Sequence, residues 1–325
     1  MIPRFRPALG WSELRAALSF PRRDDVERFE REFASLMGQR HAVAFPYGRT
    51  GLMLLLEAMG LKGKEIICPA YTCVVVPHAI VYSGNSPVFI DCREGEFNMD
   101  LDKVAESITE RTGAIIATSL FGYPVDLDKL DEIRRRHPHV RIIQDCAHSF
   151  SAEWKGRPVQ REGDAALFGM NISKLMTSIF GGMVTTDDDR LAETLRRLRS
   201  AQVKKPSLSK SVRRLLYLIA VYPAFWPPLY GLVNWLERSR FLDRFVRYYD
   251  DTLIDMPSDY LEGMTAIEAR VGRVQVGKYR AIIEAKRRLA NRILAEMSRT
   301  DGLTVLPYQE GSTYSHIVAI VGDRE

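Results

Sequence analysis

Between residues 40 and 200, short apolar runs alternate with amphipathic stretches, and this alternation constrains the fold more than any other feature. Several runs are rich in β-branched residues and almost continuously apolar, which is typical of strands covered on both faces. Regular alternation of strands and helices predicts an α/β fold with a mainly parallel seven-stranded sheet and helices on both faces. The seven predicted strands are His41–Phe45, Glu65–Pro69, Pro87–Asp91, Gly113–Thr118, Arg141–Asp145, Ala165–Gly169 and Gly182–Thr186.

After residue 200 the pattern changes. The stretch Met264–Met297 has the composition of one or two long helices, and Tyr314–Val321 is a strand-like run. We expect a large α/β domain with an N-terminal arm over residues 1–200, an apolar and basic insertion over 201–255, and long helices with the start of a small, shortened C-terminal α/β domain over 256–325. Helices are predicted within the large domain at Thr50–Met59, Tyr71–Tyr82, Leu101–Ile108, Asp126–Arg136 and Asp188–Arg199.

Composition excludes several classes of protein. The four cysteines form no CxxC pair, so neither a disulfide framework nor a zinc or other metal site is expected. The net charge of +5 is concentrated between Ala201 and Asp250, where nine Lys and Arg stand against three Asp and Glu. A nucleic-acid-binding function for the whole protein is therefore not supported. The first twenty residues contain no apolar run of signal-peptide length, so we expect a cytoplasmic protein.

The most specific local pattern pairs a carboxylate with a lysine at two predicted strand ends. Asp145 ends one strand, and Lys174 follows the end of another about thirty residues later. The carboxyl ends of parallel strands form the edge where open α/β sheets bind ligands. The spacing alone leaves open the alternative that both residues are ordinary surface charges.

Several longer segments follow one another in a characteristic order, from about residue 10 to 200 and again over Met264–Tyr279. They include AVAFPYGRTGL (Ala42–Leu52), EIICPAYTC (Glu65–Cys73), Ile108–Leu130, IIQDCAHSF (Ile142–Phe150) and the run ending at Ser173-Lys174. Together they resemble the DegT/DnrJ/StrS family of sugar aminotransferases. The resemblance implies a pyridoxal-phosphate-dependent transferase of fold type I, active as a homodimer. It also implies transfer of an amino group from glutamate or glutamine to a keto-sugar on a nucleotide or lipid, in polysaccharide or glycan biosynthesis.

The resemblance also assigns residues to roles. Lys174 matches the lysine that binds the cofactor covalently and moves the proton at the substrate carbon. Asp145 matches the carboxylate that pairs with the pyridinium nitrogen of the cofactor. His148 matches a position near the phenolic oxygen of the cofactor ring, although a histidine satisfied within the interior is the alternative. Asn171 and Ser173, just before the lysine, complete this part of the predicted cofactor-binding set.

A tight turn before a predicted helix matches the part of the family that receives the cofactor phosphate. Gly48, Arg49 and Thr50 form this turn, and helix N-terminal N–H groups attract phosphate. Family members usually have Ser-Gly-Thr here, whereas this chain has Tyr47-Gly48-Arg49. Arg49 is either an added phosphate ligand, a grip for the carboxylate of an amino-acid substrate, or a solvated arginine.

Three further positions depart from the family pattern. Cys73 stands where an aromatic ring commonly stacks on the cofactor, although it remains in the predicted binding set. Gly169 replaces a serine that usually touches the phosphate, and Leu261 replaces an asparagine that a neighbouring subunit usually contributes. These departures favour an alternative hypothesis, in which the protein is a non-catalytic or weakly active relative that serves as a membrane-attached assembly partner.

The insertion contains a run of 22 residues without a charge, Leu215–Leu236, which three prolines divide into two short helical pieces. Its aromatic residues and flanking Lys and Arg are typical of an element that lies in a membrane interface. We therefore expect peripheral membrane contact through residues 204–249, at the inner face of the membrane. A helical pair buried in a subunit interface is the alternative.

Overall fold

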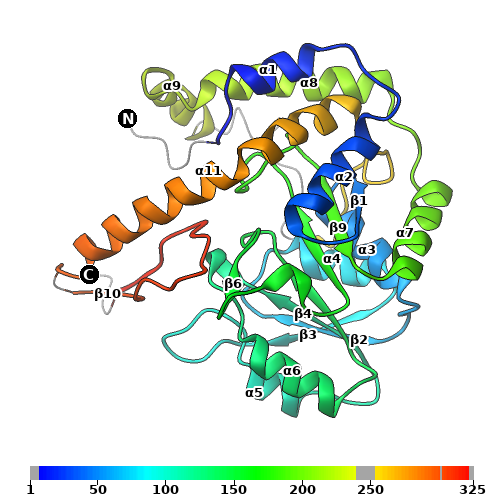
Figure 1. Ribbon diagram of the computed structural model, residues 1–325, viewed down its shortest axis with the longest axis vertical. Coiled ribbons are helices and arrows are strands. Elements are labelled where there is room, and N and C mark those ends of the chain that lie inside the picture. Colours follow the sequence, from blue (N-terminus) through cyan, green and yellow to red (C-terminus); the bar gives the residue numbers. More distant parts are fainter. Residues whose placement is uncertain (1–6, 239–252, 301, 322–325) are drawn as a thin grey trace.

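The computed structural model describes residues 7–238, 253–300 and 302–321 (Figure 1), so the part of the predicted membrane contact at 239–249 lies outside the described residues. Seven strands form the central sheet, in the order β1-β9-β8-β5-β4-β2-β3. β9 is antiparallel to its neighbours β1 and β8, and the other neighbouring pairs are parallel. The predicted sheet is confirmed. Its strands are β1 (His41–Phe45), β2 (Glu65–Pro69), β3 (Ser86–Ile90), β4 (Thr112–Thr118), β5 (Arg141–Asp145), β8 (Ala165–Gly169) and β9 (Gly182–Thr186).

Both faces of the sheet are covered, because successive strand residues point to opposite sides. In β1, Ala42 and Ala44 join one core cluster, whereas Val43 and Phe45 join the other. This two-sided burial explains the continuous apolar character of the strands. The helices that contribute to the first cluster are α2 (Asp25–Met37), α5 (Leu101–Glu106), α6 (Leu127–Arg136) and α11 (Ala266–Met297). Those of the second are α3 (Gly48–Ala58), α4 (Val75–Tyr82) and α7 (Asp189–Gln202).

Aspartates set the starts of three helices. The side chains of Asp100, Asp126 and Asp188 each accept hydrogen bonds from backbone N–H groups of the first turns of α5, α6 and α7. One predicted start is wrong, because α4 begins at Val75 and not at Tyr71. Pro77 then lies in the first turn of α4, where its missing N–H leaves no helical hydrogen bond unmade, whereas a start at Tyr71 would place it in the helix interior.

Helices α1 (Trp11–Leu18), α8 (Leu208–Ala224) and α9 (Pro227–Arg238) lie beyond α11, on the side away from the sheet (Figure 1). The apolar run is divided into two helices, as predicted, although Pro223 lies inside the end of α8. Within the described ranges, no single helix combines the length and apolar composition needed to cross a membrane. α8 and α9 satisfy both conditions only as a pair, and the pair is bent by 119°.

The C-terminal part contains the long helix α11, which starts at a capping box between Thr265 and Glu268, and an antiparallel pair of short strands. These strands are β10 (Leu303–Val305) and β11 (Ala319–Val321), so the predicted strand over Tyr314–Val321 is wrong for its first five residues. Thr313 N–H instead donates to the carbonyl of Gly122 at 2.9 Å, and Tyr314 has a positive φ of 49°. Tertiary contacts with the sheet edge thus replace strand pairing here.

Candidate active site

The carboxyl ends of β5 and β8 position the two residues that sequence analysis singles out. Asp145 is the last residue of β5, and it is buried. Its Oδ1 accepts a hydrogen bond from the N–H of Ala147 at 3.0 Å, while Thr118, the last residue of β4, lies directly beside it in the sheet register. The carboxylate is therefore held at the edge of the sheet where ligands bind in open α/β folds.

Lys174 reaches the same edge from the loop that follows β8. Asn171 holds this loop together, because its Oδ1 accepts from the N–H of Ser173 at 3.1 Å and from its hydroxyl at 2.7 Å. The carbonyl of Asn171 accepts from the N–H of Lys174 at 3.1 Å. A Cβ placed on Gly169 would lie 3.6 Å from Cε of Lys174, so the lysine side chain folds back over the end of β8. Asn171 and Ser173 are themselves exposed, and here they shape the turn.

The two charged groups interact electrostatically. Burial raises the pKa of Asp145, while the Ala147 N–H and the charge of Lys174 oppose this rise. Burial lowers the pKa of Lys174, and the charges of Asp145 and Cys73 oppose that change. Cys73 is exposed but lies close enough to act on the lysine. A buried carboxylate and a partly desolvated amine thus share one site, with a thiol beside them.

The N-terminus of α3 meets this site through three glycines. A Cβ on Gly182 would lie 2.4 Å from the backbone nitrogen of Gly48, and a Cβ on Gly48 would lie 3.4 Å from Cα of Gly169. Only residues without side chains allow such an approach at Gly182. The first N–H groups of α3 have no partner within the helix, so this end can receive an anion next to Lys174.

The side chains that follow Gly48 are engaged away from this N-terminus. The hydroxyl of Thr50 donates to the carbonyl of Tyr260 at 2.9 Å, and it is buried. Arg49 is also buried, and its Nη1 donates to the carbonyl of Asp255 at 3.5 Å. The solvated arginine that sequence analysis considered is therefore wrong. Leu261 packs at the margin of the second core cluster.

His148 lies in the loop after β5, and its neighbours were missed by sequence analysis. Its Nδ1 accepts from the N–H of Phe121 at 3.3 Å, and its ring is stacked on Phe121 with centroids 6.0 Å apart. His316 approaches from the C-terminal segment, with a ring centroid 5.5 Å from that of His148. Burial lowers the pKa of His148 to about 3, with further lowering by Lys174 and His316. The imidazole is neutral and lies within electrostatic range of the lysine.

Phe121 itself has a positive φ of 55°, a strained conformation for a residue with a bulky side chain. The segment from Gly311 to His316 stabilises this turn: Thr313 Oγ1 donates to the carbonyl of His148 at 3.0 Å, and His316 N–H donates to the carbonyl of Phe121 at 3.4 Å. No local sequence pattern connects residues this far apart. The C-terminal segment thus closes one side of the site.

These groups fit pyridoxal phosphate. The cofactor requires an amine for its aldehyde, an anion for its ring nitrogen and N–H donors for its phosphate. Lys174, Asp145 and the N-terminus of α3 offer these three features at one end of the sheet. Burial raises the pKa of Asp145 despite the Ala147 N–H and the charge of Lys174, so a ring N–H would add a further partner for this buried carboxylate.

Comparison with known proteins identifies the family. The model of the DegT/DnrJ/EryC1/StrS aminotransferase family matches residues 18–219, which is more than half of the chain. The chain belongs to this family. One similar protein is GDP-perosamine synthase of Caulobacter vibrioides (strain ATCC 19089 / CIP 103742 / CB 15). The two sequences are 38% identical over 175 residues, which cover 54% of this chain and 47% of that protein. The chain spans about half the length of the curated relatives it matches.

Solved structures agree at the level of the fold. The aminotransferase TlmJ from Streptoalloteichus hindustanus superposes with a TM-score of 0.75 and 24% identity, over 99% of this chain and 79% of that one. GDP-4-keto-6-deoxy-D-mannose-3-dehydratase from E coli, described with bound hydrated PLP, superposes with a TM-score of 0.75 and 18% identity, over 100% and 79%. The predicted α/β fold of type I is confirmed. The predicted cofactor, pyridoxal phosphate, is also confirmed for the DegT/DnrJ/EryC1/StrS family, to which the chain belongs.

Proposed function

We propose that this protein is a pyridoxal-phosphate-dependent aminotransferase that transfers an amino group from glutamate or glutamine to a keto-sugar linked to a nucleotide or lipid. The observation that carries the proposal is the meeting of Lys174 and Asp145 at one sheet edge, in a chain of this family. The similarity to a GDP-perosamine synthase supports a nucleotide-linked amino sugar as product. A keto-sugar linked to a lipid is the second substrate to test.

Each residue contributes a separate part of the reaction. Pyridoxal phosphate, when bound, withdraws electrons from the substrate carbon that loses or gains a proton. Lys174, whose lowered pKa favours the neutral amine, provides the base that carries this proton. Asp145 would pair with the ring nitrogen of the bound cofactor, and the neutral His148 would offer a hydrogen bond without adding a competing cation. The N–H groups at the start of α3 bind the phosphate.

The nature of the residue at position 174 favours amino transfer over dehydration. The solved fold relatives include a dehydratase as well as an aminotransferase, so the fold alone does not choose between the two reactions. A lysine is the residue that binds the cofactor covalently and releases it again when an amino donor reacts. Retention of Lys174 therefore supports transamination.

The proposal extends to the assembly and location of the enzyme. We infer a homodimer, because the family resemblance implies sites built from two subunits, and size-exclusion chromatography with light scattering tests this. We also infer a cytoplasmic location. All four cysteines, Cys68, Cys73, Cys92 and Cys146, are free thiols, which supports a reducing compartment.

Visible and near-ultraviolet absorbance tests the function directly. Purified protein reconstituted with pyridoxal phosphate should have an absorption band that glutamate or glutamine shifts and a keto-sugar nucleotide restores. Lys174→Ala should lose the band, whereas Lys155→Ala, a variant of an exposed lysine that pairs with Asp128, should keep it. A protein that stays colourless with excess cofactor would refute the proposal and support the alternative of a non-catalytic assembly partner.

A further inference from the structure

Helix α8 buries two charged side chains together with Leu218 and leaves a stripe of apolar side chains exposed. Its buried face carries Lys210, which has no exposed surface, and Arg214. Its exposed face carries an apolar stripe at Leu208, Val212, Leu216 and Ile219, spaced four, four and three residues apart. This spacing places the four side chains on one side of the helix. Leu208 is 81% exposed and Leu216 60% exposed, so the stripe is in full contact with solvent.

The buried charges are fixed by a buried ion-pair cluster, which we define as Tyr47, Lys210, Arg214, Asp259 and Glu268. Arg214 donates to Glu268 Oε1 at 3.0 Å, to Asp259 Oδ2 at 3.0 Å and to the hydroxyl of Tyr47 at 2.8 Å. Nζ of Lys210 lies 3.5 Å from Asp259 Oδ2. Lys210 and Arg214 are therefore not among the basic residues of this segment that could reach a membrane surface. The cluster also fixes the rotation of α8, so the apolar stripe cannot turn inward without burying unpaired charges.

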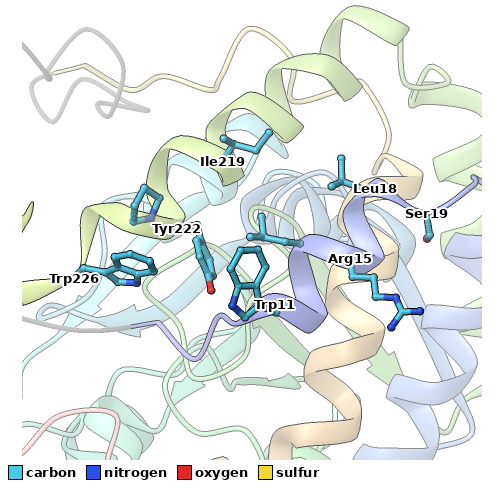
Figure 2. Close-up of a pocket in the computed structure, with 9 residues that line it drawn as sticks. Trp11, Arg15, Leu18, Ser19, Ile219, Tyr222 and Trp226 are labelled. Carbon is cyan, nitrogen blue, oxygen red and sulfur yellow. The ribbon is translucent and has the colours of Figure 1, made fainter.

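The stripe continues into a groove between α8 and α1. Figure 2 shows Trp11 and Leu18 of α1 facing Ile219, Tyr222 and Trp226 across this groove. The ring centroids of Trp11 and Tyr222 are 5.8 Å apart, and Trp11 is 76% exposed. After the bend that follows α8, α9 adds further exposed apolar side chains. We call this combined area the α1–α8–α9 surface; its exposed apolar residues are Trp11, Leu18, Leu208, Val212, Leu216, Ile219, Trp226, Leu229, Leu232 and Trp235.

Most of the exposed charges around this surface are basic, although Asp24 is exposed beside Arg23 and α9 contains Glu237 near its end. The segments 7–23 and 203–236, both within the described part of the chain, contain a single carboxylate, Glu13. That carboxylate is buried and paired with Lys278 at 2.8 Å. The exposed charged residues of the two segments are basic: Arg15, Arg22, Arg23, Lys204, Lys205 and Arg213.

We propose that the α1–α8–α9 surface binds the face of a bilayer that contains anionic phospholipids. Exposed Leu and Trp side chains enter the boundary between headgroups and acyl chains, and the surrounding Arg and Lys attract the negative headgroups. A second copy of the chain fits the same surface less well, since a twofold contact would place two basic surfaces against each other. The proposal does not depend on the aminotransferase activity.

Flotation with phospholipid vesicles tests this proposal on the full chain. The protein should float with vesicles of phosphatidylcholine and phosphatidylglycerol at low salt, and it should float poorly with phosphatidylcholine alone. The double variant Leu216→Ser/Trp235→Ser should weaken binding by about tenfold or more. Arg213→Gln should weaken it by about fivefold at low salt and change little at high salt. A matched control, Phe89→Ser/Leu289→Ser, alters two residues of similar exposure elsewhere and should bind as the wild type does.

Three results would overturn the proposal. The first is a protein that stays at the bottom with anionic vesicles at low salt. The second is equal loss of binding in the control variant, which would indicate general hydrophobic adhesion. The third is a double variant that floats normally but dissociates a dimer in size-exclusion chromatography, because the surface would then bind a second copy. Circular dichroism of both double variants verifies that each is folded.

Discussion

Gly169→Ser restores the serine that the family usually has at this position, and the structure allows its effect to be estimated. Gly169 ends β8, next to the N-terminus of α3 and below the side chain of Lys174. A Cβ there would lie 3.6 Å from Cε of Lys174 and 3.8 Å from Cβ of Ala147, both ordinary van der Waals distances. Its φ is not positive, so a side chain adds no backbone strain. The substitution should therefore leave the apoprotein folded and at least as stable.

The added hydroxyl would contribute one hydrogen bond to the cofactor phosphate. A hydrogen bond to a charged group is worth about 1.5–3 kcal/mol, and the lower value suits a partly solvated phosphate. About 1.5 kcal/mol corresponds to roughly a tenfold decrease in the Kd for pyridoxal phosphate. Gly169→Ala supplies the Cβ without the hydroxyl, so its Kd should differ from that of the wild type by less than about twofold.

Titration of the apoprotein with pyridoxal phosphate, followed by absorbance, measures the Kd of all three proteins. The comparison isolates the hydroxyl because serine and alanine place the same Cβ beside Lys174. Equal tightening by both variants would assign the gain to packing. Weaker binding by Gly169→Ser would refute a phosphate position between Gly169 and the start of α3. It would also contradict the inference that the three glycines bring a phosphate-binding helix end to this site.

Three further predictions concern stability and pH. Gly182→Ala would place a Cβ 2.4 Å from the backbone nitrogen of Gly48, so we expect the free energy of unfolding to fall by about 1–3 kcal/mol and cofactor affinity to fall with it; unchanged urea unfolding would contradict this. Arg214→Met leaves Glu268 without its ion-pair partner, with Lys210 as the remaining cation of the buried ion-pair cluster, and should cost about 3–5 kcal/mol in urea unfolding. The exposed neighbour Arg213→Met should cost about 0.5 kcal/mol or less, and similar losses in both would exclude a buried network. The pKa of His148 is lowered to about 3, whereas in the unfolded chain it has its ordinary value of 6.5. Below pH 6.5 the unfolded chain therefore binds a proton that the native state does not, and stability falls as the pH is lowered. Between neutral pH and about pH 5 the apoprotein should lose about 2 kcal/mol more than His148→Gln, and parallel urea-unfolding curves for the two would show that His148 does not cause the loss.

The sheet could be predicted because its strands are buried on both faces and its helices carry local start signals. Composition distinguishes such strands without any knowledge of their partners. The order of the strands has no such local mark, and the error at α4 shows how a single proline position decides a helix start. Residues 71–74 have an apolar character that suits either a helix or a loop.

The sequence predicts the part of the candidate site that lies at the ends of strands. Asp145 and the loop to Lys174 follow from the rule that ligands bind where parallel strands end. His316 was not predictable in this way. Its place beside His148 depends on hydrogen bonds such as that from Thr313 to the His148 carbonyl, which joins residues 165 positions apart. Sequence periodicity carries no information about contacts of that kind.

The insertion shows the same limit in its sharpest form. The sequence of α8 has apolar residues at helical spacing on more than one face, and periodicity alone does not show which face is buried. The partners of Arg214 are Asp259 and Glu268, about fifty residues further along the chain, and they determine which face turns inward. The same arginine donates to Tyr47, the N-cap residue of α3, whose next residue begins the predicted phosphate-binding turn. The ion pairs that turn the apolar stripe of α8 outward therefore also hold the residue that precedes the cofactor phosphate. A membrane-facing surface and a cofactor site thus share one structural support, and Arg214→Met should weaken both vesicle flotation and cofactor binding, whereas Leu216→Ser/Trp235→Ser should weaken flotation alone.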